Sequence, residues 1–494
     1  MQSYVDTNRD QSRAVFVPGV GCTVNSIMDM NNIESTHGST YDTAGLHRSK
    51  DPGSGAFTPY HNSLTTAVTD ISPGSELFAS YGDYWIPLIE GAQITFDDTM
   101  DRADNFLRNE YWPWMKEHDV SDALKQGMWE LTQRDFPYKS QEYSVLPSAP
   151  WSDVEAALRE LPASTSVVRT FIRQQSIRTP EWLEKHGRCQ DHIKPGRSTI
   201  KQAGRGAFAN RQLPVGTIVG YAPLVHIGYY GDEILTVDYD NGERQQKDLI
   251  INYSFGHRNS TVIITPYGGM VNYINHDKKR ANVKLRWPLG EMVAHKPDWL
   301  TKDVPFLRDT VDKIGLSFEY IALRDIKEGE EIFMDYGNEW EEAWKDHVAN
   351  WAPPEGAQDY LHTSEWAEDE VLRTEKEVET NPYPPNFITM CHDSYRVGED
   401  GHYEWIRPLR TGPERFYCTV TGRSDGEHPV YTVDLQLSEE ESIEVRNVER
   451  EGIFLYDEAF SDDWHLPGVF RHPIAIPDDI MPASWMNLPE EVIE

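Results

Sequence analysis

Residues 330–337 read EEIFMDYG, an acidic turn followed by an apolar run that ends in a tyrosine and a glycine. The apolar run after the turn at Gly329 predicts a β-strand with Tyr336 at its end. A tyrosine in that position is ordinarily a core residue whose hydroxyl group reaches the surface. Taken alone, the stretch indicates a strand and no particular function.

Two further motifs precede it in the same β-rich region: GRGAFA at 204–209 and NYINHD at 272–277. A GxG turn lets the backbone approach a ligand closely, but no GK[ST] follows, so this one is not a phosphate loop and on its own favours a structural turn. Asn275 and His276 end an apolar strand, where their polar atoms hold either a turn or an adenine-bearing ligand. Their order and spacing, taken together, are more specific than any one motif.

Together these motifs resemble the SET domain of protein lysine methyltransferases, over roughly residues 195 to 345. The likeness extends into SIRTPEWLEKHGRCQDHIKPGRSTI at 176–200 and LIINYSFGH at 249–257, which are similar to SET proteins of algae and related protists. The resemblance implies a β-clip fold, in which several small sheets surround a knot-like threading of the chain. It also implies S-adenosylmethionine as cofactor and no metal.

The resemblance assigns roles to residues at matching positions. Tyr336 falls on the catalytic tyrosine, and Tyr253 and Phe255 fall near the aromatic residues that line the channel for the substrate lysine. Trp340 and Trp344 lie where the family places an aromatic element over the cofactor, or simply pack a helix. The implied cofactor-binding residues are Gly204, Arg205, Gly206, Ala207, Phe208, Asn275 and His276.

The implied activity is protein-lysine N-methyltransferase. Methyl transfer is an in-line displacement, so its rate depends mainly on positioning. The substrate ammonium, whose pKa is ordinarily about 10.4, must lose a proton first, which an aromatic channel favours by desolvation. The alternative is an inactive SET-like scaffold that binds partners through its acidic surface or its C-terminal β domain. Asp277, where a small residue is usual in the family, favours the scaffold.

A second feature is an internal repeat. Residues 67–82 (AVTDISPGSELFASYG) and 322–337 (ALRDIKEGEEIFMDYG) share eight of sixteen residues at a constant offset of 255. Aligning the upstream segments through Asn25 and Asn272 places Met28 and Asp29 where the second copy has Asn275 and His276. We therefore expect residues 1–97 to be a partial, degenerate SET-like copy.

The fold predicted is mainly β with a helical connector: a SET-type β-clip core and a small β-barrel-like C-terminal domain. The expected segments are the partial copy 1–97, a helical connector 98–190, the SET domain 191–345, an acidic Trp-rich helical segment and linker 346–385, and a β domain 386–494. In the connector, Leu124, Met128 and Leu131 share a helix face, and Ser152 with Glu155 forms a capping-box pattern.

Composition limits the partners. The chain has 494 residues and a net charge of −35, which disfavours direct nucleic-acid binding and suits a basic protein substrate such as a histone. No run is apolar enough to span a membrane and no signal peptide is recognisable, so we expect an intracellular protein, nuclear or cytoplasmic, of open oligomeric state. The four cysteines are far apart, with no CxxC pair, and are expected to be reduced thiols.

Overall fold

The structure is a computed structural model of the chain. It describes residues 3–5, 14–16, 24–25, 30–36, 44–56, 64–79, 96–118, 120–135, 145–188, 190–229, 236–239, 244–247, 249–268, 270–292, 294–310, 314–366, 371–398, 401–407, 415–426, 428–438, 441–458, 461, 463 and 466–488. The chain divides into two compact units, one of residues 24–36 and 64–187 and the other containing the rest.

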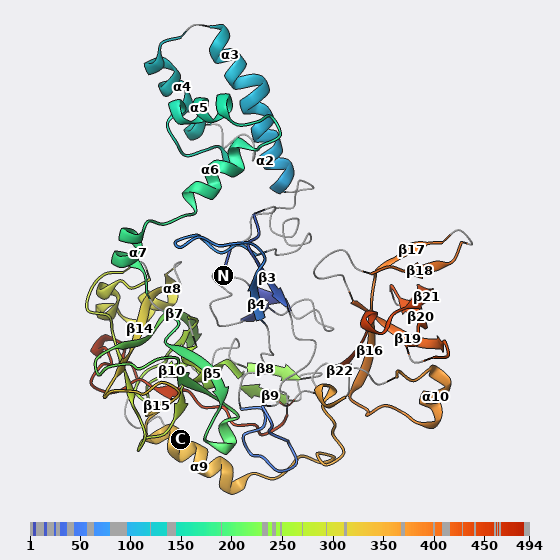
Figure 1. Cartoon of the computed structure of the whole chain (residues 1–494). Coiled ribbons are helices and arrows are strands. Elements are labelled where there is room, and N and C mark those ends of the chain that lie inside the picture. Colours follow the sequence, from blue (N-terminus) through green and yellow to red (C-terminus); the bar gives the residue numbers. More distant parts are fainter. Residues whose placement is uncertain are drawn as a thin grey trace. The chain divides into compact units, whose positions relative to one another are not determined.

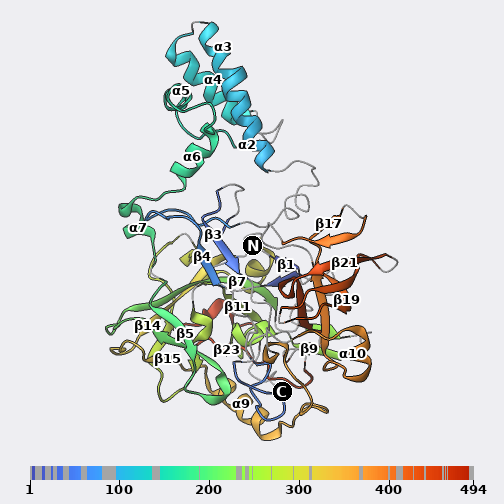
Figure 2. The same ribbon diagram turned by 45° about the vertical axis from the view of Figure 1, so that its right-hand side comes forward.

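The larger unit contains the region of the three motifs, built on two sheets (Figures 1 and 2). The first, in the order β13-β14-β7-β11-β10-β23, consists of β13 (Val283–Arg286), β14 (Ile314–Ala322), β7 (Ile218–Tyr229), β11 (Val262–Pro266), β10 (Phe255–Gly256) and β23 (Ile474–Ala475). The second, β12-β15-β6-β5, consists of β12 (Asn275–His276), β15 (Glu331–Met334), β6 (Arg205–Ala209) and β5 (Ile193–Arg197). Each of the three motifs contributes one strand to this second sheet.

Short helical elements connect these strands. They are η4 (Lys201–Ala203), η6 (Leu249–Tyr253), η7 (Val271–Tyr273), η8 (Pro297–Thr301), α8 (Val304–Asp309) and α9 (Asn338–Asn350). Two hairpins, β1 (Ser3–Val5) with β2 (Ala14–Phe16) and β8 (Thr236–Tyr239) with β9 (Arg244–Lys247), also belong to this unit.

The C-terminal segment differs from the expected boundaries, because β23 joins the sheet of β10 and not the C-terminal β domain. Ile476, Met481 and Trp485 of the same segment are buried in the core formed by the two sheets. Trp485 lies in a short helical turn, η12 (Ala483–Trp485), and its ring contacts Trp287. The expectation of one continuous domain over 386–494 is therefore wrong, since strand pairing with a distant partner leaves no mark in the local pattern.

The separate C-terminal β domain ends near residue 457. Its sheet, in the order β17-β18-β21-β20-β19-β16-β22, is formed by β17 (Tyr395–Val397), β18 (Tyr403–Trp405), β21 (Ser442–Val448), β20 (Tyr431–Gln436), β19 (Arg415–Arg423), β16 (Phe387–His392) and β22 (Ile453–Asp457). Outside the sheet lie η9 (Thr363–Glu365), α10 (Glu375–Thr380) and η10 (Arg450–Gly452). Along the chain, β16 is the first strand of this domain and β22 is the last, and the two pair with each other. Glu458 N also donates to Asn386 O at 2.6 Å, so the chain enters and leaves the domain at neighbouring points.

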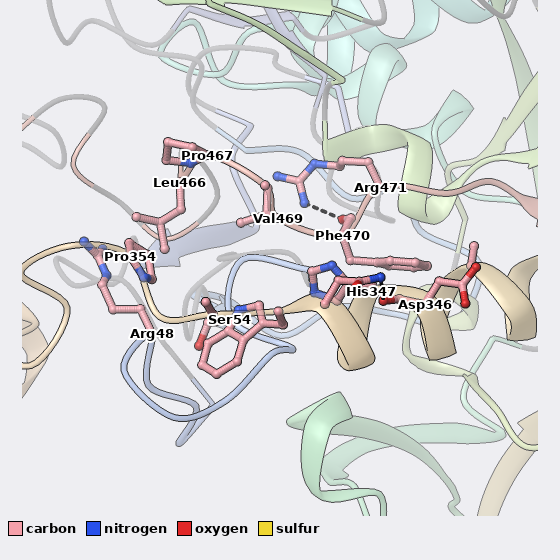
Figure 3. Close-up of a pocket in the computed structure, with 15 residues that line it drawn as sticks. Arg48, Ser54, Asp346, His347, Pro354, Leu466, Pro467, Val469, Phe470 and Arg471 are labelled. Atoms are coloured by element: carbon pink, nitrogen blue, oxygen red, sulfur yellow. Dashed lines mark hydrogen bonds between the residues drawn. The ribbon is translucent and has the colours of Figure 1, made fainter.

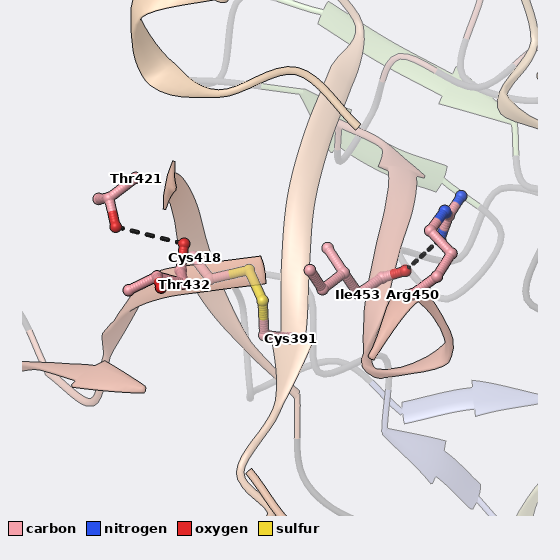
Figure 4. The surroundings of a disulfide bond; sticks show 6 residues. All are labelled: Cys391, Cys418, Thr421, Thr432, Arg450 and Ile453. Atoms are coloured by element: carbon pink, nitrogen blue, oxygen red, sulfur yellow. Dashed lines mark hydrogen bonds between the residues drawn. A yellow bond between two sulfur atoms is a disulfide. The ribbon is translucent and has the colours of Figure 1, made fainter. Parts of the chain in front are cut away.

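Cys391 on β16 and Cys418 on β19 form a disulfide across neighbouring strands, with 5.7 Å between their Cα atoms (Figure 4). The prediction of reduced thiols is wrong for these two cysteines. They are 27 residues apart in the sequence, and only the antiparallel pairing of β16 with β19 brings them together. Cys22 and Cys189 lie outside the described residues.

The smaller unit contains the helical connector, drawn in blue to green in Figure 1. Its helices are α2 (Phe96–Asn105), the π-helical η2 (Phe106–Tyr111), α3 (Trp112–Glu117), α4 (Asp122–Asp135), α5 (Trp151–Glu160), α6 (Val167–Gln175) and α7 (Pro180–His186). Among the described helices of the chain, none is both long and apolar enough to cross a membrane.

Two details of the connector differ from expectation. Leu124 and Leu131 are exposed, and the buried face of α4 carries Trp129 instead. Helix α5 begins at Trp151 with Pro150 as N-cap, so Ser152 lies in the first turn and forms no capping box. In both cases the helix is where the pattern predicts it, but tertiary packing decides which face is buried and where the helix starts.

The two repeated segments have the same backbone pairing. The strand β3 (Ile33–Thr36) pairs with β4 (Leu64–Ala67) in the register that β13 and β14 use, residue for residue. Asn32, which precedes β3, donates its side-chain amide to Glu76 O (2.8 Å) and accepts from Phe78 N (2.8 Å). Asn282, which precedes β13, makes the equivalent bonds to Glu331 O and Phe333 N, both at 2.9 Å.

This pairing corrects the upstream alignment of the repeat. Asn25 forms a parallel bridge with Phe78, just as Asn275 pairs in parallel with Phe333. Asn25 therefore takes the place of Asn275, not of Asn272, and Ser26 follows it where the second copy has His276. The sequence alignment matched the wrong asparagine because NYIN offers two of them three residues apart. Ser26, Met28 and Asp29 lie outside the described residues.

Candidate functional site

The GxG turn and the Asn-His pair are joined by hydrogen bonds. Asn275 Nδ2 donates to Arg205 O at 2.7 Å and to Ser198 Oγ at 3.2 Å. Gly204 has a positive φ of 66°, which favours glycine at the start of the turn. A Cβ on Gly206 would lie 2.3 Å from Glu331 Oε1, so a larger residue at this position would displace the Glu331 carboxylate. Of the remaining residues predicted here, Ala207 is buried and Phe208 is half-buried, both on β6.

The carboxylate of Glu331, on β15, also belongs to the site, and the sequence reasoning missed it. Glu331 is 6% exposed and accepts from Ser198 Oγ (2.6 Å), Thr199 N (2.8 Å) and Thr199 Oγ1 (2.6 Å). These bonds fix the hairpin that carries the GxG turn. A signal was present, because the glutamate is one of the eight residues shared by the two repeats, where Glu76 Oε1 accepts from Asn25 Nδ2.

His276 and Tyr336 are held against each other. The Tyr336 backbone N–H donates to His276 Nδ1 at 3.0 Å, so this nitrogen carries no proton. Burial lowers the pKa of His276, which agrees with a neutral ring. The Tyr336 hydroxyl donates to Ile274 O, and burial raises the pKa of Tyr336. Tyr336 is therefore a neutral phenol, able to donate or accept a hydrogen bond but unable to act as a base near neutral pH.

Tyr253 and Phe255, the two predicted channel residues, line one small cavity together with Tyr336. Tyr320, buried on β14, and Ile474 of β23 also face it. The remaining lining residues are Val271, Asn272, Ile274 and Met334. The cavity is narrow and mostly apolar, and sequence reasoning missed the contribution of Ile474, which comes from the far end of the chain.

An aromatic row runs along α9 from the site. The ring centroid of Trp340 lies 4.9 Å from that of His276 and 5.0 Å from that of Tyr336. Trp340 also stacks on Trp344, with 6.0 Å between the two ring centroids. Phe470 contacts both tryptophans edge-on. Trp340 thus touches the Asn-His motif directly, whereas Trp344 continues the row away from it.

The basic stretch after the Asn-His pair forms an ordered turn despite the unusual residue at position 277. Asp277 Oδ1 accepts from the backbone N–H groups of Lys279 (3.0 Å) and Arg280 (2.9 Å), and Oδ2 accepts from Arg280 Nε at 2.6 Å. Arg280 also donates to Thr199 Oγ1 and lies over the ring of Phe333. Asp277 therefore caps the turn and leaves Asn275 and His276 in place.

A larger cavity of about 520 Å³ lies along the second half of α9 (Figure 3). Its walls come from α9, from the segment around Ser54 and from residues 466–471. None of the cofactor-binding or catalytic residues predicted from the sequence lines it. Arg471 is held there by bonds to Gly55 O (2.6 Å) and Phe470 O (2.8 Å).

Comparison with known families identifies a SET domain at residues 204–337. No curated protein matches the chain. Solved structures that it resembles include a Plasmodium falciparum protein classed as a histone methyltransferase, at 18% identity and a TM-score of 0.20, over 31% of this chain and 98% of that one. Others are Chaetomium thermophilum polycomb repressive complex 2, at 22% identity and a TM-score of 0.19, and the same complex bound to S-adenosylmethionine, at 20% and 0.18. Each of these two matches covers 33% of this chain and 17% of that chain.

The family match and the two small sheets over the matched residues identify a SET fold within a mainly β chain. The residues present also suit the cofactor that SET methyltransferases use. Asn275 Oδ1 accepts no hydrogen bond from the described residues, although Nδ2 of the same amide makes two. The two bonds of Nδ2 fix the orientation of the Asn275 side chain and so the position of Oδ1. This oxygen, beside the glycine turn and the neutral His276, can accept a hydrogen bond from a polar ligand.

Proposed function

We propose that the chain is a protein-lysine N-methyltransferase that uses S-adenosylmethionine. The observation that carries this proposal is the meeting, in one SET domain, of the GxG turn, the Asn-His pair and a tyrosine that faces a narrow aromatic cavity. When bound, S-adenosylmethionine would supply an activated methyl group. The backbone of residues 204–208, Asn275 and His276 would hold it.

The chain's own residues account for the rest of the chemistry. The cavity walls of Tyr253 and Phe255 would desolvate the substrate amine and so lower its pKa. The neutral amine, with its proton lost to solvent before attack, then offers its lone pair. Tyr336 and Ile274 O, already hydrogen-bonded, would orient the amine and surround the transferring methyl group with oxygen atoms. Tyr336 would not remove the proton.

A basic protein is the substrate class that the charge of the chain supports. A net charge of −35 attracts cationic partners and raises their rate of encounter. Histones fit this description.

We further propose that residues 24–79 are an incomplete SET-like copy without a cofactor site. The matched registers of β3–β4 and β13–β14 support this. In the second copy β15 pairs with the GxG strand β6, whereas in the first copy Glu76 N donates to Ser176 O and Arg178 N donates to Gly74 O. Residues after α6 thus take the place of the opening strand.

The experiment is methyl transfer from labelled S-adenosylmethionine to basic proteins, with cofactor affinity measured by calorimetry. Asn275→Ala should weaken binding by at least about 1 kcal/mol, roughly fivefold in Kd. Asn109→Ala, an exposed asparagine on η2, is the matched control and should leave Kd unchanged. A folded Asn275→Ala chain with wild-type affinity would refute the site, and a wild-type chain that binds no cofactor would favour the scaffold alternative.

A further inference from the structure

Residues 44–56, which we name the clasp, lie directly against the turn that precedes the GxG strand. A Cβ on Gly204 would lie 2.8 Å from Ala44 Cβ, and a Cβ on Gly53 would lie 2.2 Å from Gln202 O. Only close contact between the two backbones produces such distances. The clasp is about 150 positions away in the sequence and lies outside the matched SET domain.

Polar contacts fix this packing. Gln202 Oε1 accepts from Gly53 N at 3.1 Å, and Gln202 Nε2 donates to Asp51 Oδ1 at 3.2 Å. Asp51 is 2% exposed, and its second oxygen accepts from His47 N at 3.0 Å. Lys201 Nζ lies 3.7 Å from Asp51 Oδ1. The side-chain amide of Gln202 therefore both donates a hydrogen bond to the clasp and accepts one from it.

The opposite side of the clasp is anchored to other parts of the same unit. Pro52 O lies 2.9 Å from His347 Nε2 of α9, and Ala56 O accepts from Asn252 Nδ2 at 2.7 Å. Arg48 forms a buried ion pair with Asp463, with Nε and Oδ1 2.6 Å apart. The clasp is thus bonded both to the turn and to side chains of His347, Asn252 and Asp463.

We propose that the clasp positions the cofactor turn, with Asp51 and Gln202 as positioning residues that do not touch the cofactor. This inference rests on the proposed function. The turn continues into Arg205, whose carbonyl accepts from Asn275, so a displaced turn would pull away from the Asn-His pair. Cofactor affinity would then depend on residues far outside the SET domain.

The test exploits the short distance between Gln202 and Asp51. Gln202→Glu places a second carboxylate beside a buried one, and the repulsion should raise the Kd for S-adenosylmethionine at least about tenfold. At saturating cofactor kcat should stay near the wild-type value. In the double variant Asp51→Asn/Gln202→Glu the new amide donates to the new carboxylate, which should restore Kd to within about threefold. Gln358→Glu, beside the exposed Asp359, is the matched control and should have no effect.

A second readout does not depend on the cofactor. Amide hydrogen exchange at residues 203–209 should accelerate in Gln202→Glu and return to the wild-type rate in the double variant. Gly53→Ala should have the same effect as Gln202→Glu, whereas Gly290→Ala, where a Cβ meets nothing within 4 Å, should not. Unchanged exchange and affinity in Gln202→Glu, or failure of the double variant to restore them, would overturn the proposal. If the wild type bound no cofactor while exchange followed this pattern, the proposed function would fail and the positioning role of the clasp would stand.

Discussion

Tyr336 is the residue on which the chemistry depends most. Its hydroxyl is buried, neutral and bonded to Ile274 O. It would therefore act on the substrate amine by orienting it and through its dipole, without carrying a charge. Tyr336→Phe should lower kcat by at least about tenfold, because a hydrogen-bonding group beside the reacting atoms is lost. Tyr431→Phe is the matched control, since that tyrosine is also buried and accepts a bond from Leu372 N, but in the C-terminal β domain.

Steady-state kinetics on both variants, with thermal midpoints, make this comparison. Both midpoints should fall by a few degrees at most, as expected for the loss of one hydrogen bond. Equal kcat values in Tyr336→Phe and the wild type would contradict the assignment.

His276 gives the site a pH dependence. Burial lowers its pKa, and Nδ1 must stay unprotonated to accept from Tyr336 N. The unfolded chain, with a histidine pKa of about 6.5, therefore takes up the proton first as pH falls. The contribution of His276 to stability is complete above that pH and is lost progressively below it.

The corresponding measurement is the thermal midpoint between pH 7.5 and pH 5. His276→Asn keeps an acceptor near the position of Nδ1 but does not titrate, so its midpoint should fall less steeply with acid than that of the wild type. Other histidines with lowered pKa values, such as His295 and His472, titrate in both proteins and cancel in the comparison. Parallel curves for the two proteins would show that His276 is not held neutral by the fold.

At the scale of elements, the C-terminal segment is part of the SET core. Trp485 is fully buried there, while its neighbour Met486 is 44% exposed. Trp485→Ala should cost about 3–5 kcal/mol of unfolding free energy, the usual range for a buried tryptophan. Met486→Ala should be close to neutral. Denaturant titrations of the two variants distinguish them, and a small effect of Trp485→Ala would remove this segment from the core.

The disulfide makes a prediction about the C-terminal β domain. Closing a loop of 27 residues lowers the entropy of the unfolded chain, which stabilises the folded domain by about 3.5 kcal/mol in the entropic description. Reduction, or Cys391→Ser with Cys418→Ser, should lower the thermal midpoint of that domain and leave the Kd for S-adenosylmethionine unchanged. Calorimetric unfolding with and without reductant provides the test. A wild-type chain that contains four free thiols after purification without reductant would contradict the bond.

The strands could be predicted from the sequence because each motif is local, whereas the meeting of the three motifs was implied by their joint resemblance to the SET domain. Sequence reasoning did not find Ile474 or the clasp, since their positions depend on contacts across more than a hundred residues. The same limit explains the disulfide, which depends on the pairing of β16 with β19. Leu124 and Leu131 show the converse, because a correct helical period did not reveal which face the fold buries.

At the scale of the whole molecule, the internal repeat bears on the number of cofactor sites in one chain. In the first copy Asn25 replaces Asn275 and donates to Glu76, yet the residue after it is Ser26 where the second copy has His276. The second copy alone combines the GxG turn, Asn275, His276 and Tyr336. We therefore predict one cofactor site per chain, in the second copy of the repeat.

Isothermal titration of the full chain with S-adenosylmethionine tests this claim most directly. The expected result is a single class of site, one cofactor per chain, whose Kd rises in Asn275→Ala and is unchanged in Asn25→Ala. Two equivalent sites per chain, a loss of affinity in Asn25→Ala equal to that in Asn275→Ala, or no binding by the folded wild type would contradict it.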